Sequence, residues 1–257
     1  GLIAVEDLNE ALQVQNSVDF GLTGGIHSLD PLEVARWLGA VEVGNAYVNR
    51  ETTGAVVQRQ PFGGWKRSSV GPGAKTGGPD YLLQLGTWMP TREFSEVDQA
   101  EALVSDEVWW DKHYGIDRDP VGLFCESNVH RYRPHPDLVV RIGPGAKAAE
   151  VERVLAASAR CGVEPRISRA TDEDDAEFSR SLSAHRFGRV RAIGFLSEVV
   201  RRAASVHGVG VIDEAVTASG RLELRHHLRE QAVSQTLHRF GNLVASGLSI
   251  TKEDRYD

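Results

Sequence analysis

A glycine-rich stretch between residues 54 and 79 is the part of this sequence best suited to ligand chemistry. It contains the run Gly71-Pro72-Gly73-Ala74-Lys75-Thr76-Gly77-Gly78. Glycine lets a backbone approach a ligand closely and turn consecutive N–H groups toward an anion, so the stretch suits a carboxylate. Long irregular loops inside compact domains are usually functional. The alternative is a simple connector rich in glycine and proline.

The same run partly imitates a loop that binds nucleoside triphosphates, but it departs from that pattern at two positions. The pattern needs glycine directly before the lysine and another glycine five positions earlier. Here Ala74 precedes Lys75, and Ser69 stands at the earlier position. The sequence therefore predicts no nucleoside triphosphate site.

The other reactive or metal-binding side chains form no recognisable site. The two cysteines, Cys125 and Cys161, are too few for a disulfide framework and lack the spacing of metal ligands. His226 and His227 are adjacent, so they point to different faces of a helix. We expect both cysteines to be inert, and we expect no catalytic residue and no metal site in this chain.

The elements that position the loop follow from hydrophobic spacing. Residues 1–5 are expected to form a strand, and the apolar residues of 6–16 recur at helical spacing. A short strand is expected at 22–28. Asp30-Pro31 then supplies an N-cap and a first-turn proline for a second helix. A further strand at 46–48 completes the order strand, helix, strand, helix, strand before the loop.

The second half of the chain predicts a separate α/β unit. Residues 94–137 combine a helix-compatible stretch with many turn-forming residues, so they are interpreted as a connector. Strands and helices alternate after it, which indicates a parallel sheet with right-handed crossovers. The predicted strands lie at 138–142, 165–167, 190–195 and 209–212. The predicted division is therefore 1–93, 94–137, 138–250 and a tail at 251–257.

The first turn of this second unit has the form of a dinucleotide-binding fingerprint. Gly143, Gly145 and Ala148 fit G-x-G-x-x-A between a strand and a helix. However, Ile167-Ser168-Arg169 stands where an acidic residue should bind the ribose hydroxyls. Lys147 could neutralise a pyrophosphate, but a solvated lysine is the more common case. We expect no cofactor-binding residue here.

Two stretches of the first half resemble the closing segment of the aldehyde dehydrogenase superfamily catalytic domain. They are Gly44-Asn45-Ala46-Tyr47-Val48-Asn49-Arg50 and Gln60-Pro61-Phe62-Gly63-Gly64-Trp65-Lys66-Arg67-Ser68-Ser69. The glycine-rich run that follows is similar to one branch, the L-glutamate γ-semialdehyde (pyrroline-5-carboxylate) dehydrogenases. The resemblance implies an NAD-dependent oxidation of the semialdehyde to L-glutamate in proline catabolism.

The resemblance also implies roles for particular residues. Gly77 and Gly78 match positions whose backbone amides hold the substrate's α-carboxylate, and Phe62 matches an aromatic residue that lines the aldehyde tunnel. The family's catalytic cysteine, its general base and most of its NAD-binding residues have no match here. We expect them upstream of Gly1, in a longer protein of which this chain is a truncated part.

The later segments 128–134 and 228–243 resemble the C-terminal domain of long proline utilization A proteins. In that family this domain is a degenerate aldehyde dehydrogenase fold that covers the catalytic domain. The expected fold class is therefore α/β, the end of a catalytic domain followed by a Rossmann-like one. FAD is implied only if a proline dehydrogenase domain is fused upstream. The competing hypothesis is a non-catalytic module for oligomerisation or tunnel covering.

Composition limits the remaining classes. The formal net charge of -7 disfavours a nucleic-acid partner. No apolar stretch approaches the roughly 18 residues that would span a bilayer, and no secretion signal is recognisable. We expect a cytoplasmic protein that forms a homo-oligomer and acts on a small-molecule substrate.

Overall fold

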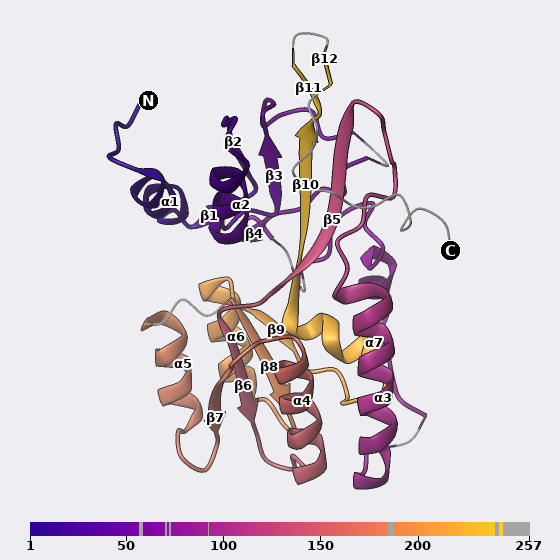
Figure 1. Cartoon of the computed structure of the whole chain (residues 1–257). Coiled ribbons are helices and arrows are strands. Elements are labelled where there is room, and N and C mark those ends of the chain that lie inside the picture. Colours follow the sequence, from indigo (N-terminus) through magenta and orange to yellow (C-terminus); the bar gives the residue numbers. More distant parts are fainter. Residues whose placement is uncertain are drawn as a thin grey trace.

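The computed structural model describes residues 1–56, 59–69, 71, 73–91, 93–184, 188–239 and 242–243. Pro72 of the glycine-rich run and residues 244–257, which include the expected tail, lie outside the described residues. Two four-stranded sheets, one above the other in Figure 1, organise the described chain. The fold is mixed α/β, which confirms the predicted class.

The upper sheet contains strands from both ends of the chain. Its order is β2–β3–β10–β5, with β2, β3 and β10 parallel and β5 antiparallel to β10. The long β5 and β10 run side by side through the middle of the molecule (Figure 1). The bounds are β2 Thr23–Ile26, β3 Asn45–Val48, β5 Glu126–Pro134 and β10 Leu228–Thr236.

Two helices cover one face of this sheet. Helix α1 (Leu8–Asn16) is capped by Asp7, and α2 (Pro31–Ala40) is capped by Asp30, whose carboxylate accepts the Leu32 N–H at 2.8 Å. These caps satisfy backbone donors that a helix start leaves free, and they confirm the predicted Asp30-Pro31 signal. The shared core contains Leu12, Val34, Trp37, Leu38, Ala46, Val48, Val129 and Val233.

The predicted strand at 1–5 is wrong. These residues form no regular element, and Leu2 and Ile3 are exposed. Strand propensity creates a strand only where a neighbouring strand accepts its hydrogen bonds. Among the described residues, no segment pairs with 1–5.

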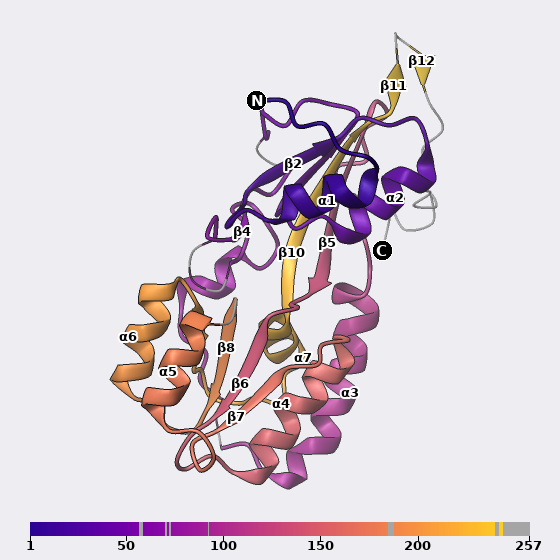
Figure 2. The same cartoon turned by 90° about the vertical axis from the view of Figure 1, so that its left-hand side faces the viewer.

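The lower sheet is fully parallel, as the alternation of strands and helices predicts. Its order is β7–β6–β8–β9. Helices α5 and α6 cover one face and α3 and α4 the other, as Figure 2 shows and as the two core clusters require. The bounds are β6 Leu138–Ile142, β7 Arg166–Arg169, β8 Arg189–Ile193, β9 Gly210–Ile212, α3 Gln99–Trp109, α4 Ala148–Arg160, α5 Asp175–Ala184 and α6 Glu198–His207.

Short elements complete the described chain. Two small antiparallel pairs join β1 (Phe20–Gly21) to β4 (Trp65–Lys66) and β11 (His238–Arg239) to β12 (Asn242–Leu243). The 3-10 helices are η1 (Tyr81–Leu85), η2 (Glu96–Asp98) and η4 (Leu224–His227), and η3 (Trp110–Tyr114) is a π-helical turn. Helix α7 (Gly220–Glu223) leads into η4 and then into β10.

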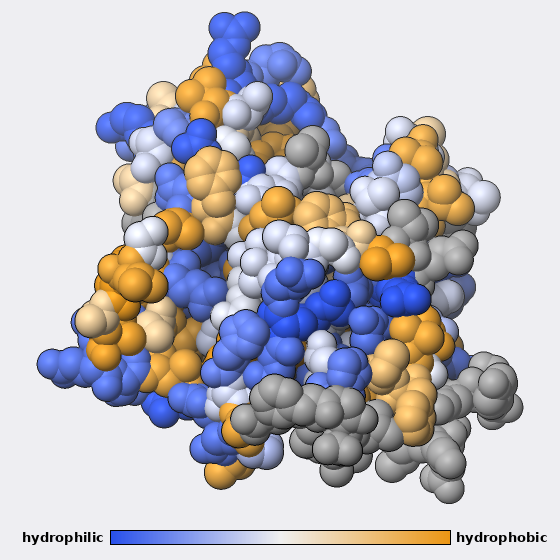
Figure 3. Space-filling model, turned by 90° about the horizontal axis from the view of Figure 1, so that it is seen from above, coloured by the Kyte–Doolittle hydropathy of each residue, from blue (hydrophilic) through white to orange (hydrophobic). Residues whose placement is uncertain are grey.

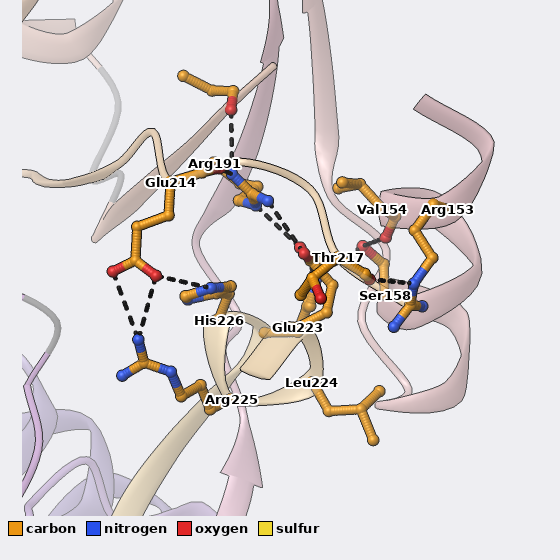
Figure 4. Close-up of polar contacts among 12 residues, drawn as sticks. Arg153, Val154, Ser158, Arg191, Glu214, Thr217, Glu223, Leu224, Arg225 and His226 are labelled. Carbon is orange, nitrogen blue, oxygen red and sulfur yellow. Dashed lines mark hydrogen bonds and ion pairs between the residues drawn. The ribbon is translucent and has the colours of Figure 1, made fainter. Parts of the chain in front are cut away.

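Buried ion pairs fix the point where the chain leaves the lower sheet for β10 (Figure 4). Arg191 of β8 makes a two-pronged contact with Glu223, at 2.9 and 3.0 Å, and both side chains are fully buried. Glu214 lies 3.4 Å from Arg225 and 3.8 Å from His226. Because buried charges are costly without partners, these pairs specify the path of the chain between the two sheets.

Residues 94–137, which the sequence predicts to be a connector, contain helix α3 and strand β5. Strand β10, which lies in the expected second domain, pairs with β3 of the first. The domain boundaries remain a prediction, but two late strands add to the sheet formed by the first 50 residues.

Candidate functional site

The glycine-rich loop packs on the face of the upper sheet that α1 and α2 leave free. Side chains alternate between the two faces of a strand. Even-numbered residues of β5 and β10 therefore face the loop, and those that contact it or its neighbours are polar. They are Asn128, His130, Tyr132, Glu230 and Ser234.

A backbone bridge places Phe62 beside the residue before Gly77. The Phe62 N–H donates to the Thr76 carbonyl at 3.0 Å, and the Thr76 N–H donates back at 2.9 Å. The Phe62 side chain is 38% exposed, so it is available to a ligand. The structure thus brings the three predicted site residues into one short region.

A tight turn from Lys75 to Gly78 shapes this region. The Gly78 N–H donates to the Lys75 carbonyl at 2.8 Å, and Gly77 has a φ of +78°, a conformation that favours glycine. A Cβ on Gly77 would meet nothing within 4 Å, whereas one on Gly78 would lie 2.9 Å from Glu230 Oε2. Gly77 therefore has open space beside its backbone. Position 78 requires glycine, because any side chain there would clash with Glu230.

The Lys75 side chain points inward rather than toward a ligand. It is 1% exposed, and its Nζ donates to Asn45 Oδ1 at 2.9 Å and to the Gly63 carbonyl at 2.5 Å. Burial lowers the pKa of this ammonium to about 7, while the charge of Glu230 opposes the shift. Lys75 thus ties the turn to β3 and to the start of the loop.

Glu230 supports the turn from the sheet. Its Oε2 accepts the Lys75 N–H at 3.2 Å and lies 3.2 Å from His130 Nε2. Both Glu230 and His130 are almost fully buried. The carboxylate thus has two polar partners, as a buried charge requires.

Asp80 supplies a second attachment, just after the turn. The Tyr132 hydroxyl donates to Asp80 Oδ2 at 2.7 Å and lies 2.8 Å from His113 Nε2. Burial disfavours the charged form of Asp80, but hydrogen bonds from His113 and Tyr132 outweigh it and keep its pKa below the usual value. Burial raises the pKa of Tyr132, so this hydroxyl keeps its proton.

The start of the loop is held by a third polar group. Gln60 Nε2 donates to Asn128 Oδ1 at 3.0 Å and to Ser234 Oγ at 2.7 Å. Ser234 also accepts from Arg50 Nη1 at 2.9 Å. Sequence reasoning missed all these supporting residues. No local pattern in 126–134 or 228–236 singles them out, because polar residues stand at both odd and even positions of these segments.

The outer edge of the loop faces the lower unit. A cavity of about 430 Å³ lies between them, lined by Lys66 and Arg67 on one side and by Arg189 and Val209 on the other. Arg229 stacks on Trp65, with its guanidinium carbon 3.7 Å from the ring centroid. The lower unit therefore borders the loop directly.

The two thiols show no activated environment. Cys161 is 1% exposed, its Sγ lies 3.6 Å from the Leu224 carbonyl, and burial raises its pKa. Cys125 is exposed and directly precedes β5. A nucleophilic cysteine needs a lowered pKa, which Cys161 lacks.

The fingerprint-like turn of the lower unit fits a dinucleotide poorly. A Cβ on Gly143 would lie 2.0 Å from the Phe195 carbonyl, so this glycine serves backbone packing. The Gly143 N–H already donates to Ile193 O at 2.9 Å, and Lys147 pairs with Glu93. The backbone and the lysine that would meet a pyrophosphate are thus engaged within the protein.

Neither a metal cluster nor a membrane-spanning helix is found among the described residues. They contain no group of three or more His, Cys, Asp or Glu residues placed to hold a metal ion. No helix among them is long and apolar enough to cross a membrane.

Comparison with known proteins shows what each part of the chain is similar to. The sequence model of the aldehyde dehydrogenase family matches residues 2–87. The 1-pyrroline-5-carboxylate dehydrogenases of Staphylococcus aureus strains JH1 and N315 are each 46% identical over 85 residues, 33% of this chain and 16% of theirs. The structure of proline utilization A (PutA) from Corynebacterium freiburgense has a TM-score of 0.78 and 44% identity, covering 93% of this chain and 25% of that one.

Residues 2–87 match the aldehyde dehydrogenase family, and the chain as a whole is similar to proline utilization A. This confirms the resemblance drawn from the sequence motifs. The matched residues 2–87 include the loop with Phe62, Gly77 and Gly78, while the likeness to PutA extends over both units. Aldehyde dehydrogenases generally use NAD or NADP. The chain spans only 16% of the curated relatives and 25% of the PutA chain.

Proposed function

We propose that this chain is part of a longer NAD-dependent dehydrogenase that oxidises L-glutamate γ-semialdehyde to L-glutamate in proline catabolism. Its contribution is the loop that receives the substrate's α-carboxylate. The reactive thiol, the general base and the main NAD-binding residues belong to other parts of that protein. FAD belongs to it only if a proline dehydrogenase domain is fused upstream.

The observation that carries the proposal is the Lys75–Gly78 turn, which lies within residues 2–87, the stretch matched by the aldehyde dehydrogenase family model. Gly77 leaves open space beside its backbone, and Phe62 borders the same region. A carboxylate placed there meets the amides of Gly77 and Gly78. The Gly78 N–H then shares its bond with Lys75 O, as three-centre bonds allow.

Covering the loop is the proposed role of the lower unit. The cavity beside Lys66 and Arg67 separates the loop from that unit, and the blocked Gly143 turn argues against a second cofactor site. The unit thus shapes access to the site without performing chemistry.

The second candidate function is a non-catalytic module for oligomerisation. Figure 3 shows hydrophobic patches interrupting a largely hydrophilic upper face. Exposed apolar side chains, including those of Leu2, Ile3, Leu29 and Leu32, favour a protein–protein contact. We propose that the parent enzyme is a cytoplasmic homo-oligomer, so the two candidates are compatible.

The test is NADH formation by the full-length protein that contains this chain. With NAD, we expect turnover of glutamate semialdehyde at a much lower KM than that of propanal, which lacks the carboxylate. Turnover of propanal alone would contradict the substrate assignment. The isolated 257 residues should form no NADH, and activity from them would contradict the placement of the reactive thiol elsewhere.

A further inference from the structure

Strands β5 and β10, which pair in the middle of the molecule, hold the proposed carboxylate site at two points. We propose that Glu230 and Tyr132 are positioning residues for the substrate carboxylate, because they fix both ends of the segment that contains Gly77 and Gly78. The inference rests on the proposed function, in which that segment binds the carboxylate.

The first point of attachment precedes the glycines. Glu230 Oε2 accepts the Lys75 N–H at 3.2 Å, and the Lys75 carbonyl accepts the Gly78 N–H at 2.8 Å. The N–H and the carbonyl of Lys75 thus connect the Glu230 carboxylate to the Gly78 end of the turn. His130 limits the rotation of Glu230 through its own 3.2 Å contact.

The second point of attachment follows the glycines. The Tyr132 hydroxyl donates to Asp80 Oδ2 at 2.7 Å. The Leu83 N–H donates to the Asp80 carbonyl at 3.1 Å and starts the next turn. Asp80 therefore links the exit of the glycine pair to strand β5.

Both attachments come from one place in the sheet. Glu230 and Tyr132 are directly paired across the antiparallel ladder of β10 and β5. Strands in such a ladder have a fixed spacing, so the two side chains set the separation of Lys75 and Asp80. Gly77 itself has a left-handed backbone and open space beside it, so its position depends on the residues that flank it.

This arrangement predicts a selective kinetic effect. Misplacing a binding group weakens the interaction that depends on it and spares substrates that do not use it. Loss of either attachment should weaken carboxylate binding, while the reaction of an aldehyde without a carboxylate continues unchanged.

The experiment uses the full-length protein and two substrates, glutamate semialdehyde and propanal. In Glu230→Ala, we expect the KM for the semialdehyde to rise about tenfold, the scale of one lost charge-assisted hydrogen bond. The KM for propanal and both kcat values should stay near wild type. Glu230→Gln keeps an acceptor for the Lys75 N–H and should restore most of the affinity.

Tyr132→Phe is the milder variant and decides the question if Glu230→Ala fails to fold. It removes only the hydroxyl that reaches Asp80 and His113. We expect a rise of about threefold to tenfold in the semialdehyde KM alone, as for one neutral or charge-assisted hydrogen bond.

Two controls separate positioning from general destabilisation. Arg133→Ala changes the neighbouring residue of β5, whose side chain bonds to Gly39 O on the opposite face at 3.2 Å. Glu223→Gln disturbs a buried ion pair of the lower unit. Neither should alter the ratio of the two KM values, although Glu223→Gln should lower the Tm.

The outcomes distinguish a failure of the proposed function from a failure of the positioning inference alone. A wild-type enzyme with no preference for the semialdehyde would overturn the proposed function and the inference together. A wild-type preference that survives both Glu230→Ala and Tyr132→Phe, or variants that raise both KM values equally, would overturn the inference alone.

Discussion

Glu230 and Tyr132 are opposed residues of the β10–β5 ladder, and their side chains end on the two sides of the Gly77–Gly78 pair. Glu230 and Lys75 are 155 positions apart in the chain. The conformation of a loop in the first third of the sequence therefore depends on strands that the chain forms much later. The loop therefore cannot keep its conformation without strands β5 and β10.

Substitution of Gly78 should impair both binding and stability. In Gly78→Val, the new Cβ would lie 2.9 Å from Glu230 Oε2 and 3.0 Å from the Lys75 carbonyl, so the turn must shift. We expect the KM for glutamate semialdehyde to rise more than that for propanal, together with a loss of about 1–3 kcal/mol in unfolding free energy. Steady-state kinetics and urea unfolding measure the two effects.

Gly86→Ala is the matched control for this variant. Gly86 has an extended backbone, and a Cβ there would meet nothing within 4 Å. It should leave both KM values and the stability near wild type. If Gly78→Val behaves like this control, the turn does not have the proposed role.

Lys75 should make stability increase with pH above neutrality. Its pKa is about 7 in the folded protein, against 10.5 for an ordinary lysine. Below pH 7 both states are protonated, and the folded state carries the cost of the buried ammonium. Between pH 7 and about 10 only the unfolded state keeps the proton, so unfolding takes up a proton and the folded state gains stability as pH rises.

Lys75→Met should remove that gain. Urea unfolding between pH 6 and 10 should give a flatter profile for this variant than for wild type. Lys147→Met serves as the control, since its partly exposed ammonium has a raised pKa and titrates above this range. Parallel profiles for wild type and Lys75→Met would show that Lys75 does not titrate there.

The Arg191–Glu223 pair should contribute to stability against acid. Burial favours the neutral form of Glu223, but the charge of Arg191 outweighs burial and holds the Glu223 pKa well below the 4.5 of an ordinary glutamate. A depressed folded-state pKa stabilises the protein above the unfolded-state value, and that contribution is lost as pH falls below it.

Removal of one partner leaves the other charge buried. We therefore expect Glu223→Ala to lower the unfolding free energy at pH 7 by about 3–5 kcal/mol. The difference from wild type should shrink as pH falls below the usual range of a carboxyl group. Denaturant unfolding at pH 7 and pH 3 provides the measurement, and a difference that is equal at both values would contradict the sign.

Gly143 should matter for packing and not for a cofactor. In Gly143→Ala, the Cβ would lie 2.0 Å from the Phe195 carbonyl, so we expect a loss of about 1–3 kcal/mol in stability. Gly145→Asn is the control. It places a residue that tolerates left-handed backbone at a φ of +80°, with nothing within 4 Å.

NAD binding by the full-length protein should be unchanged in Gly145→Asn, as calorimetry can determine. A second NAD site that this variant abolishes would restore the dinucleotide interpretation of the lower unit.

The sequence by itself determined the local features of this protein. Asp30-Pro31 predicts the start of α2 because an N-cap acceptor and a proline at the first helical position act within one turn. The alternation after residue 138 predicts the parallel lower sheet for a similar reason, because each βαβ unit is a nearly local structure. The motif around Phe62 lies in the stretch that the aldehyde dehydrogenase family model matches, so the resemblance was visible from the sequence alone.

Only the tertiary structure decided which strands lie beside the loop. The sequence predicts a connector at 94–137 and no strand at 228–236, and local patterns do not identify strand partners, since pairing joins residues far apart in sequence. For the same reason, the sequence did not identify Glu230 and Tyr132 as supporting residues of the loop. The role of a buried charge or hydroxyl depends on its hydrogen-bond partner. Here the partner of Glu230 is Lys75, and the partner of Tyr132 is Asp80.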